Sequence, residues 1–342
     1  MRARGWVGLG ITSLLIVGGG GALALGDYVY RTGTSVPCEV NEDDLANTPE
    51  GFYTPEEGPF PGEGWAKWVG YDLSEWWLSD IPIETLQIPV SDDVTLEASW
   101  IKAGYPNSEE TVIVTHGYGS SRRDYNALLP ASMLALEGFN VLLVDQRDTG
   151  NSTCVDGRHS AGQDESDDFA AVAEWLVMEQ GISPEKIGMF GVSGGGIATA
   201  ILPAKTENVR AFAIEAPIFD FADTAKAEVE FQGFPAFLWQ LADVAARIRG
   251  VDLNETPIPA GITAAGDRPI LLLHGTDDQR LAYAGAVKFK EFGESQGIDV
   301  RLETFEGADH TEGMLLETKR YQAALVSFFR DALGDPSLPA QG

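Results

Sequence analysis

Residues 186–200 read KIGMFGVSGGGIATA, and this stretch decides the fold. An apolar run leads into GVSGG at residues 191–195, and small apolar residues follow. That order predicts a strand, a sharp turn and a helix, with the hydroxyl of Ser193 at the tip of the turn, where flanking glycines permit close backbone approach. The pattern G-x-S-x-G therefore marks Ser193 as a candidate nucleophile.

The same five-residue pattern occurs a second time, as GESQG at residues 293–297. This copy ends a helical stretch and precedes a strand, which is the reverse of the context that a nucleophile turn requires. Ser295 is therefore not the candidate. Because a short motif is weak evidence by itself, the rest of the chain has to supply the partners of Ser193.

Strand and helix patterns alternate along the rest of the chain, which predicts an α/β fold with a doubly wound, mainly parallel sheet. The first two strands form an antiparallel hairpin, and a small helical insertion precedes the seventh strand. Pro130 is expected to kink or divide its helix. The predicted strands are 86–90, 95–101, 111–115, 140–144, 187–190, 209–214, 269–273 and 300–305. The predicted helical segments are 124–136, 164–181, 194–200, 219–249, 283–292 and 314–333.

The chain of 342 residues carries 52 acidic and 23 basic residues, a formal charge of −29. Its hydrophobic fraction of 44% indicates a globular protein rather than a disordered one. Such an acidic surface repels phosphate backbones, so nucleic acid is excluded as a partner. We interpret the charge mainly as a solvated, self-repelling surface, the alternative being a preference for neutral or cationic substrates.

Residues 5–26 contain no charged side chain, Arg2 and Arg4 precede them and Asp27 follows. This length suffices to span a bilayer as a helix, and the arginines predict a cytoplasmic N-terminus. The alternative is a cleaved signal peptide, because residues 22–24 read ALA. We favour an uncleaved membrane anchor. Either interpretation predicts that the body of the protein lies outside the cytoplasm.

The predicted domains are an anchor or signal segment at 1–31, an arm at 32–84, the catalytic domain at 85–334 and a short tail at 335–342. The arm is rich in Pro, Gly and aromatic residues, and we expect it to lie on the domain surface as an extended segment or short helix. A partner-binding face is the alternative. Cys38 and Cys154 fit no metal site, and the sequence leaves open whether they form a disulfide or stay independent thiols.

Reactive side chains follow four of the predicted strands. The strand ends read HGYG at 116–119, Ser193 with its glycines, HGTDD at 274–278 and GADH at 307–310. Because the carboxyl ends of parallel strands meet at one edge of a sheet, these groups are expected to lie close together.

A serine hydroxyl needs a base, normally a histidine held by a carboxylate. Among the four histidines, His310 follows the last strand and comes after an acid, which gives the chain order Ser, Asp, His. His116 and His274 each precede a glycine and are expected to pack or to hydrogen-bond their loops, and His159 lies in a polar loop. His310 is therefore the predicted base.

With these residues in view, the region 86–333 resembles the α/β-hydrolase superfamily, in its esterase-like and peptidase-like branch. The family pattern H-G-x-x-D implies Asp278 as the acid, which leaves Asp277 as a turn residue. DQRDTGNS at 145–152 is similar to the family's D-x-R-G-x-G-x-S loop, with Asp148 in place of a glycine.

The resemblance implies a serine hydrolase that cleaves a small-molecule ester, amide or thioester, with carboxylesterase activity as the leading interpretation. It also implies that the backbone N–H groups of Tyr118 and Gly194 bind the oxyanion, although HGYG could be a simple glycine-rich turn. No cofactor or metal is expected, and the oligomeric state stays open. The rival hypothesis is a catalytically silent, membrane-anchored ligand-binding protein of the same fold.

The insertion at 219–249 contains a run of large apolar side chains. They could line an acyl pocket, but we favour their being the buried face of one helix. They are Phe231, Phe234, Phe237, Leu238 and Trp239.

Overall fold

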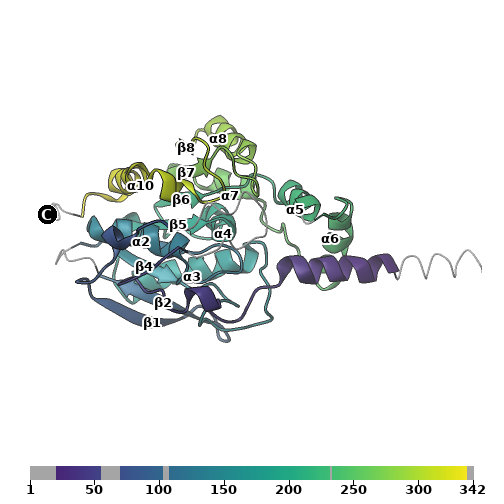
Figure 1. Ribbon diagram of the computed structural model, residues 1–342, viewed down its shortest axis with the longest axis horizontal. Helices are drawn as coiled ribbons and strands as arrows, with labels where there is room; N and C mark the ends of the chain where they lie inside the picture. The colour runs from purple at the N-terminus through teal and green to yellow at the C-terminus, as the bar shows by residue number, and fades with distance from the viewer. Residues whose placement is uncertain (1–20, 55–69, 103–107, 232, 337–342) are drawn as a thin grey trace, which may run out of the picture.

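The computed structural model describes residues 21–54, 70–102, 108–231 and 233–336. Its centre is one eight-stranded sheet with the strand order β1-β2-β4-β3-β5-β6-β7-β8 (Figure 1). The strands are β1 (Ile83–Pro89), β2 (Thr95–Ile101), β3 (Thr111–Thr115), β4 (Asn140–Val144), β5 (Ile187–Val192), β6 (Ala211–Glu215), β7 (Ile270–Gly275) and β8 (Val300–Phe305).

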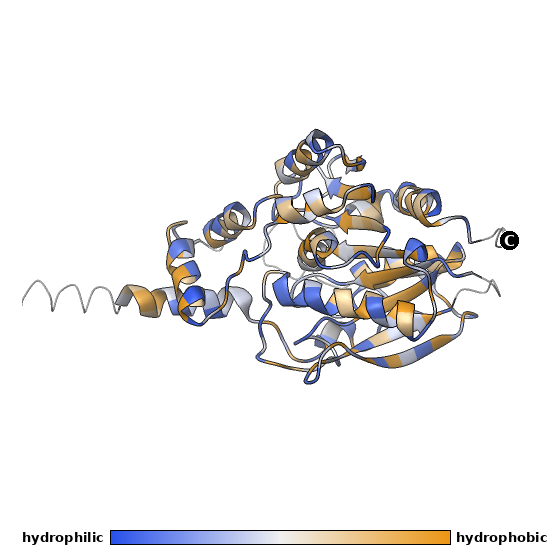
Figure 2. Cartoon of the chain, turned by 180° about the vertical axis from the view of Figure 1, so that it is seen from behind, coloured by the Kyte–Doolittle hydropathy of each residue, from blue (hydrophilic) through white to orange (hydrophobic). Residues whose placement is uncertain are grey.

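β1 pairs with β2, and β2 with β4, in antiparallel register, whereas every pair from β4 to β8 is parallel. The carboxyl ends of β3, β5, β6, β7 and β8 therefore meet at the same edge. The predicted α/β fold with an N-terminal antiparallel hairpin is confirmed. The central strands are buried along their whole length and mostly apolar, because both of their faces are covered (Figure 2).

Helices pack on both faces of the sheet, as the doubly wound prediction requires (Figure 1). One core cluster joins the sheet to α2, α9 and α10, and a second joins it to α3, α4, α7 and α8. The helices are α2 (Tyr125–Leu136), α3 (Gln163–Met178), α4 (Gly194–Ile201), α5 (Phe221–Phe231), α6 (Leu238–Ile248), α7 (Ile258–Ala264), α8 (Ala284–Ser295), α9 (Gly313–Leu316) and α10 (Thr318–Leu333).

Pro130, which we predicted to kink or divide its helix, does not divide it. α2 runs without a break through Pro130, and every residue from Tyr125 to Ala135 is buried. A proline inside a helix removes one backbone hydrogen bond. Packing of this helix against the sheet and α10 offsets that loss.

The arm contributes to the core and does not merely lie on the surface. Phe52 and Trp76 are buried in the same cluster as α2 and α10, and the indole of Trp77 donates to the carbonyl of Phe52 at 3.0 Å. Three further aromatic residues of the arm, Phe60, Trp65 and Trp68, lie outside the described residues.

A disulfide between Cys38 and Cys154 fastens the arm to the loop after β4, with 5.4 Å between the two Cα atoms. Next to it, Val36 N–H donates to Gly157 O at 3.0 Å, and Ser35 forms an isolated β-bridge with Arg158. These contacts hold the arm against the carboxyl edge of the sheet.

Residues 21–34 form a helix that packs on α6, projecting away from the sheet (Figure 1). Most of the predicted anchor, residues 5–20, lies outside the described residues. Among the described helices, none has the length and apolar character needed to cross a membrane.

The disulfide generates a stability prediction. It closes a loop with a sequence separation of 116 residues, which limits the unfolded chain more than the folded one. The double substitution Cys38→Ser and Cys154→Ser should therefore lower the free energy of unfolding by about 2–5 kcal/mol. Urea denaturation measures this loss. Dithiothreitol should destabilise the wild type by a similar amount and leave the double variant unchanged, and equal stability of the two proteins would contradict the account.

Candidate active site

Ser193 stands between β5 and α4 in a backbone conformation that side-chain-bearing residues rarely adopt, with φ 50° and ψ −109°. Its N–H donates to the carbonyl of Glu215 at 2.9 Å, which ties the turn to the end of β6. A Cβ on Gly191 would lie 2.4 Å from the carbonyl oxygen of Gly195. Only glycine at position 191 therefore lets the turn close this tightly.

The three predicted catalytic side chains meet at the carboxyl edge of the sheet. His310 Nε2 lies 3.1 Å from Ser193 Oγ, and His310 Nδ1 lies 2.8 Å from Asp278 Oδ2. His310 and Asp278 are buried, whereas Ser193 is partly exposed. Because Asp278 can only accept at Nδ1–H, His310 Nε2 is left to accept the proton of the serine hydroxyl.

The carboxylate of Asp278 accepts hydrogen bonds on both oxygens. Oδ1 accepts from the backbone N–H groups of Arg280 at 2.9 Å and Leu281 at 2.7 Å. Oδ2 is shared by His310 and His274, whose Nε2 lies 3.1 Å away. Burial opposes ionisation, but the charge on His310 and the hydrogen bonds from both histidines outweigh it and hold the pKa of Asp278 below its ordinary value of 3.8.

Asp277 is exposed, with its carboxylate accepting from Thr276 Oγ1 at 3.2 Å, and it does not reach His310. A second buried acid, Asp309, joins the two loops that carry the site. Asp309 accepts from the backbone N–H of Gln279 at 3.0 Å and from that of His310 at 2.7 Å. Asp309 thus clamps the loop after β8 to the loop after β7, which keeps His310 beside Asp278.

The other three histidines are held in structural roles. His116 Nδ1 lies 2.8 Å from Gly117 O, and its Nε2 accepts from Gln146 N–H at 3.2 Å; burial lowers the pKa of this ring. His159 packs edge-on against the ring of Tyr118. His274 was expected only to stabilise its loop. It does bond Leu281 O at 2.9 Å, but it also supports the candidate acid, a contact that sequence reasoning missed.

The predicted oxyanion donors lie side by side. A Cβ built on Gly194 would stand 2.7 Å from the backbone nitrogen of Tyr118. Across the described part of the chain, neither N–H donates a hydrogen bond to another protein group. Two adjacent amides with free donors beside Ser193 Oγ can stabilise a negatively charged oxygen. The phenol of Tyr118 donates away from this point, to Ser35 O at 2.7 Å.

Glu215, at the end of β6, was not among the predicted site residues. It is fully buried, and its Oε2 lies 3.0 Å from the hydroxyl of Tyr321, whereas Oε1 has no hydrogen-bond partner among the described residues. Burial, helped by the nearby charge of Asp278, raises the pKa of Glu215 well above 4.5. An acid directly after a buried apolar strand is the sequence signal that could have indicated it.

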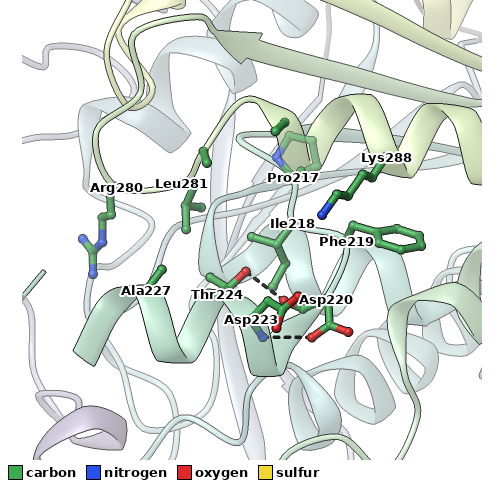
Figure 3. A pocket seen from close by; sticks show the side chains of 13 residues that line it. Pro217, Ile218, Phe219, Asp220, Asp223, Thr224, Ala227, Arg280, Leu281 and Lys288 are labelled. Atoms are coloured by element: carbon green, nitrogen blue, oxygen red, sulfur yellow. Dashed lines mark hydrogen bonds between the residues drawn. The ribbon is translucent and has the colours of Figure 1, made fainter. Parts of the chain in front are cut away.

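A cavity of about 160 Å³ lies beyond the ends of β6 and β7, between α5 and α8 (Figure 3). Arg280, which follows the acid Asp278, and Leu281 form part of its wall, and Asp223 and Lys288 face it from the two helices. Phe219 lines it, but the five large apolar residues that the sequence analysis singled out in the insertion do not. Leu238 is buried, but Phe231, Phe234 and Phe237 are exposed, so our prediction of one buried helix face was wrong for these three.

The loop at 145–152 keeps its shape without the family's glycine. Asp148 has φ 61°, the left-handed conformation that glycine would otherwise supply. Its Oδ1 accepts from the backbone N–H groups of Asp156 and Gly157, each at 2.9 Å, which offsets the strain. Cys38, Asp148 and Cys154 come close enough to hold a metal, but the two sulfurs are joined to each other and offer no thiolate.

An eight-stranded α/β sheet that carries a serine on its nucleophile turn, with an acid and a histidine at neighbouring strand ends, defines a hydrolase of the α/β-hydrolase fold. Comparison with protein families agrees. The sequence pattern of the prolyl oligopeptidase family matches residues 127–336, more than half of the chain, so the chain belongs to this family.

Solved structures are similar to this chain in fold, and a curated relative is similar in part of its sequence. The esterase Pf2001 of Pyrococcus furiosus superposes with a TM-score of 0.60 at 22% identity, covering 83% of this chain and 100% of the esterase. An acylaminoacyl peptidase of Pyrococcus horikoshii gives a TM-score of 0.60 at 17% identity, over 78% of this chain and 43% of its own. At these identities the likeness shows the fold.

Human Protein ABHD12B is 27% identical in an alignment of 193 positions that covers 54% of this chain and 49% of the human protein. The match therefore spans about half the length of that relative.

The protonation of Glu215 generates a pH prediction. Because its pKa is raised in the folded state, its stabilising contribution is complete below the unfolded value of 4.5 and is lost as pH rises toward the folded-state pKa. The wild type should lose up to about 1.4 kcal/mol of unfolding free energy per pH unit from this group. Glu215→Gln removes that dependence.

Urea unfolding at several pH values between about 5 and 8 tests this linkage. The stability of Glu215→Gln relative to wild type should increase steadily with pH, whereas the exposed control Glu306→Gln should show no such trend. A constant difference between Glu215→Gln and wild type across this range would show that Glu215 is ionised in the folded protein.

Proposed function

We propose that this hydrolase is a serine esterase that works through an acyl-enzyme, with Ser193 as nucleophile, His310 as general base and Asp278 as the acid that orients it. The contact chain from Ser193 Oγ to His310 Nε2 at 3.1 Å and from His310 Nδ1 to Asp278 Oδ2 at 2.8 Å carries this proposal. These are the distances over which a proton can pass from the serine to a properly oriented imidazole.

In the first half-reaction, Ser193 Oγ attacks the substrate carbonyl carbon while its proton moves to His310 Nε2. The ionised Asp278 stabilises the imidazolium that forms. The carbonyl oxygen becomes negative and accepts from the N–H groups of Tyr118 and Gly194. His310 then gives its proton to the leaving alkoxide, and the bond between the carbonyl carbon and the leaving oxygen breaks.

In the second half-reaction, water takes the place of the leaving alcohol. His310 Nε2 accepts a proton from the water as its oxygen attacks the acyl-enzyme, and then returns the proton to Ser193 Oγ as the acid product departs. No step requires a metal or redox partner, because every proton is exchanged between the substrate, water and His310.

A neutral ester is the substrate class that these surroundings favour. The overall formal charge of −29 disfavours anionic substrates at a site beside buried acids. An amide has a poorer leaving group, which must be protonated before it departs. Because the family includes peptidases, the same mechanism can also cleave amides. We therefore propose that esters are preferred over amides as substrates.

We further propose that the protein is held in a membrane by residues 5–26, with the catalytic domain outside the cytoplasm. The uncharged stretch after Arg2 and Arg4 supports the anchor, and the disulfide between Cys38 and Cys154 supports an oxidising compartment.

Steady-state hydrolysis of p-nitrophenyl esters of graded chain length tests the catalytic proposal. Ser193→Ala should lower kcat by about 10⁶-fold and Asp278→Asn by about 10⁴-fold, because each removes one member of the proton-transfer chain. The neighbouring exposed Asp277→Asn is the matched control and should retain kcat within a few-fold. A larger loss in Asp277→Asn would overturn the assignment, and a wild type that hydrolyses no ester would favour the ligand-binding hypothesis.

A reporter fused to the C-terminus tests the topology. A phosphatase that folds only outside the cytoplasm should be active there and should stay in the membrane fraction, because the anchor is not removed. Activity of a cytoplasm-specific reporter at the same position would contradict the proposed orientation, and release of the fusion into the medium would indicate cleavage of the N-terminal segment.

A further inference from the structure

The helix at residues 21–34 and the insertion formed by α5 and α6 make one packed unit, which we call the cap and define as the described residues of 21–34 and 219–250. Tyr30 is buried against Ala242 and Ala246 of α6. The ring of Phe221 in α5 packs on Trp239 in α6, with 5.5 Å between their centroids. The cap is therefore a unit with its own small core.

The helix approaches α6 closely at a glycine. A Cβ on Gly26 would lie 2.2 Å from the carbonyl oxygen of Leu241, so only glycine lets the two backbones come together here. Nearby, Arg249 Nε donates to Asp27 Oδ1 at 2.7 Å. These contacts fix the direction in which the helix leaves the body of the protein (Figure 1).

Exposed apolar side chains concentrate on the cap. Of the fourteen large apolar residues that are exposed in the described part of the chain, eight belong to this unit, with exposed fractions between 43% and 69%. They are Leu23, Leu25, Tyr28, Phe231, Phe234, Phe237, Val244 and Ile248. Concentrated exposure of this kind marks an interaction surface, whereas single exposed residues do not.

The cap is also less acidic, for its length, than the chain as a whole. Residues 21–34 and 219–250 contain six acidic and four basic residues, so they carry −2 of the formal charge of −29. Residues 231–242, which include the three exposed phenylalanines, contain no charged residue. An anionic surface, which the rest of the molecule would repel, would therefore meet little electrostatic repulsion at the cap.

The position of the cap indicates what covers it. The uncharged segment 5–26 runs directly into the helix at 21–34, and both the start of that helix and α6 lie at the end of the long axis opposite the C-terminus (Figures 1 and 2). If the proposed anchor lies in a bilayer, the exposed side chains at the start of the helix and in the insertion next to it face the same lipid surface.

From these observations, we infer that the cap docks on the lipid bilayer that holds the proposed anchor, with the phenylalanines of the α5–α6 connection inserted at the headgroup boundary. Aromatic and aliphatic side chains are stabilised at that depth, whereas charged ones are not. A second copy of the chain is the competing occupant.

Docking would fix the active site close to the membrane. The far end of the helix reaches the site, because the phenol of Tyr118 lies 3.1 Å from Gly33 O and 2.7 Å from Ser35 O. A helix of fourteen residues is about 20 Å long, so the candidate oxyanion hole would lie about that far from the bilayer surface. The inference rests on the anchor proposed above and not on the catalytic roles.

Environment-sensitive fluorescence in reconstituted full-length protein tests the docking. Both native cysteines are in the disulfide, so Phe234→Cys or Phe237→Cys gives a single site for the fluorophore NBD. Met178→Cys, at the end of α3 and 71% exposed, is the matched control on the body. Each protein is placed in phosphatidylcholine vesicles with or without lipids that carry a quenching doxyl group near the headgroup.

Docking predicts blue-shifted NBD emission at positions 234 and 237 and at least about twofold quenching by the doxyl lipids, with neither effect at 178. Absence of doxyl quenching at 234 and 237 overturns the inference, and a blue shift without quenching identifies a second protein copy as the occupant. A chain that fails to float with vesicles overturns the anchor and the docking together. Hydrolysis of a soluble ester in the same samples tests the catalytic proposal separately.

Discussion

The hydrogen-bonded carboxylate of Asp278 is the interaction on which the catalytic edge depends. A buried carboxylate without donors would take up a proton, and it would then neither orient His310 nor stabilise its positive charge. Here two backbone amides and two histidines donate to it. These donors come from the end of β7 and from the loops after β7 and β8, which are neighbours because the two strands are parallel and adjacent. The sheet therefore fixes the protonation state as well as the positions of the reacting groups.

Glu215 lies at the same edge of the sheet, but its pKa is shifted in the opposite direction to that of Asp278. It is as deeply buried as Asp278, but among the described residues only the hydroxyl of Tyr321 donates to its carboxyl group, and the negative Asp278 is nearby. With few donors and a like charge in reach, the neutral form is favoured. The pKa values of two buried acids on adjacent strands are thus shifted in opposite directions because of their hydrogen-bond partners and neighbouring charges.

Much of the fold follows from local sequence patterns, because the buried strands are short apolar runs and the reactive residues come directly after them. Ser193 and His310 could be predicted at this edge for that reason, whereas the choice of Asp278 over Asp277 came from the resemblance to the family pattern. The path of the helix through Pro130 could not, since it depends on packing from both sides. The burial of Phe52 and Trp76, the pairing of Cys38 with Cys154 and the protonation of Glu215 likewise arise from contacts between segments distant in sequence. The left-handed Asp148 shows that a departure from a family pattern can keep the same backbone.

The most direct test of the account is the site of covalent labelling by a fluorophosphonate, which reacts with serines activated by a neighbouring base. Peptide mapping of the labelled full-length protein should find one adduct, on Ser193, and the labelling should be lost in His310→Ala. An adduct on another serine such as Ser295, or labelling of Ser193 that does not require His310, would contradict the proposed catalytic arrangement.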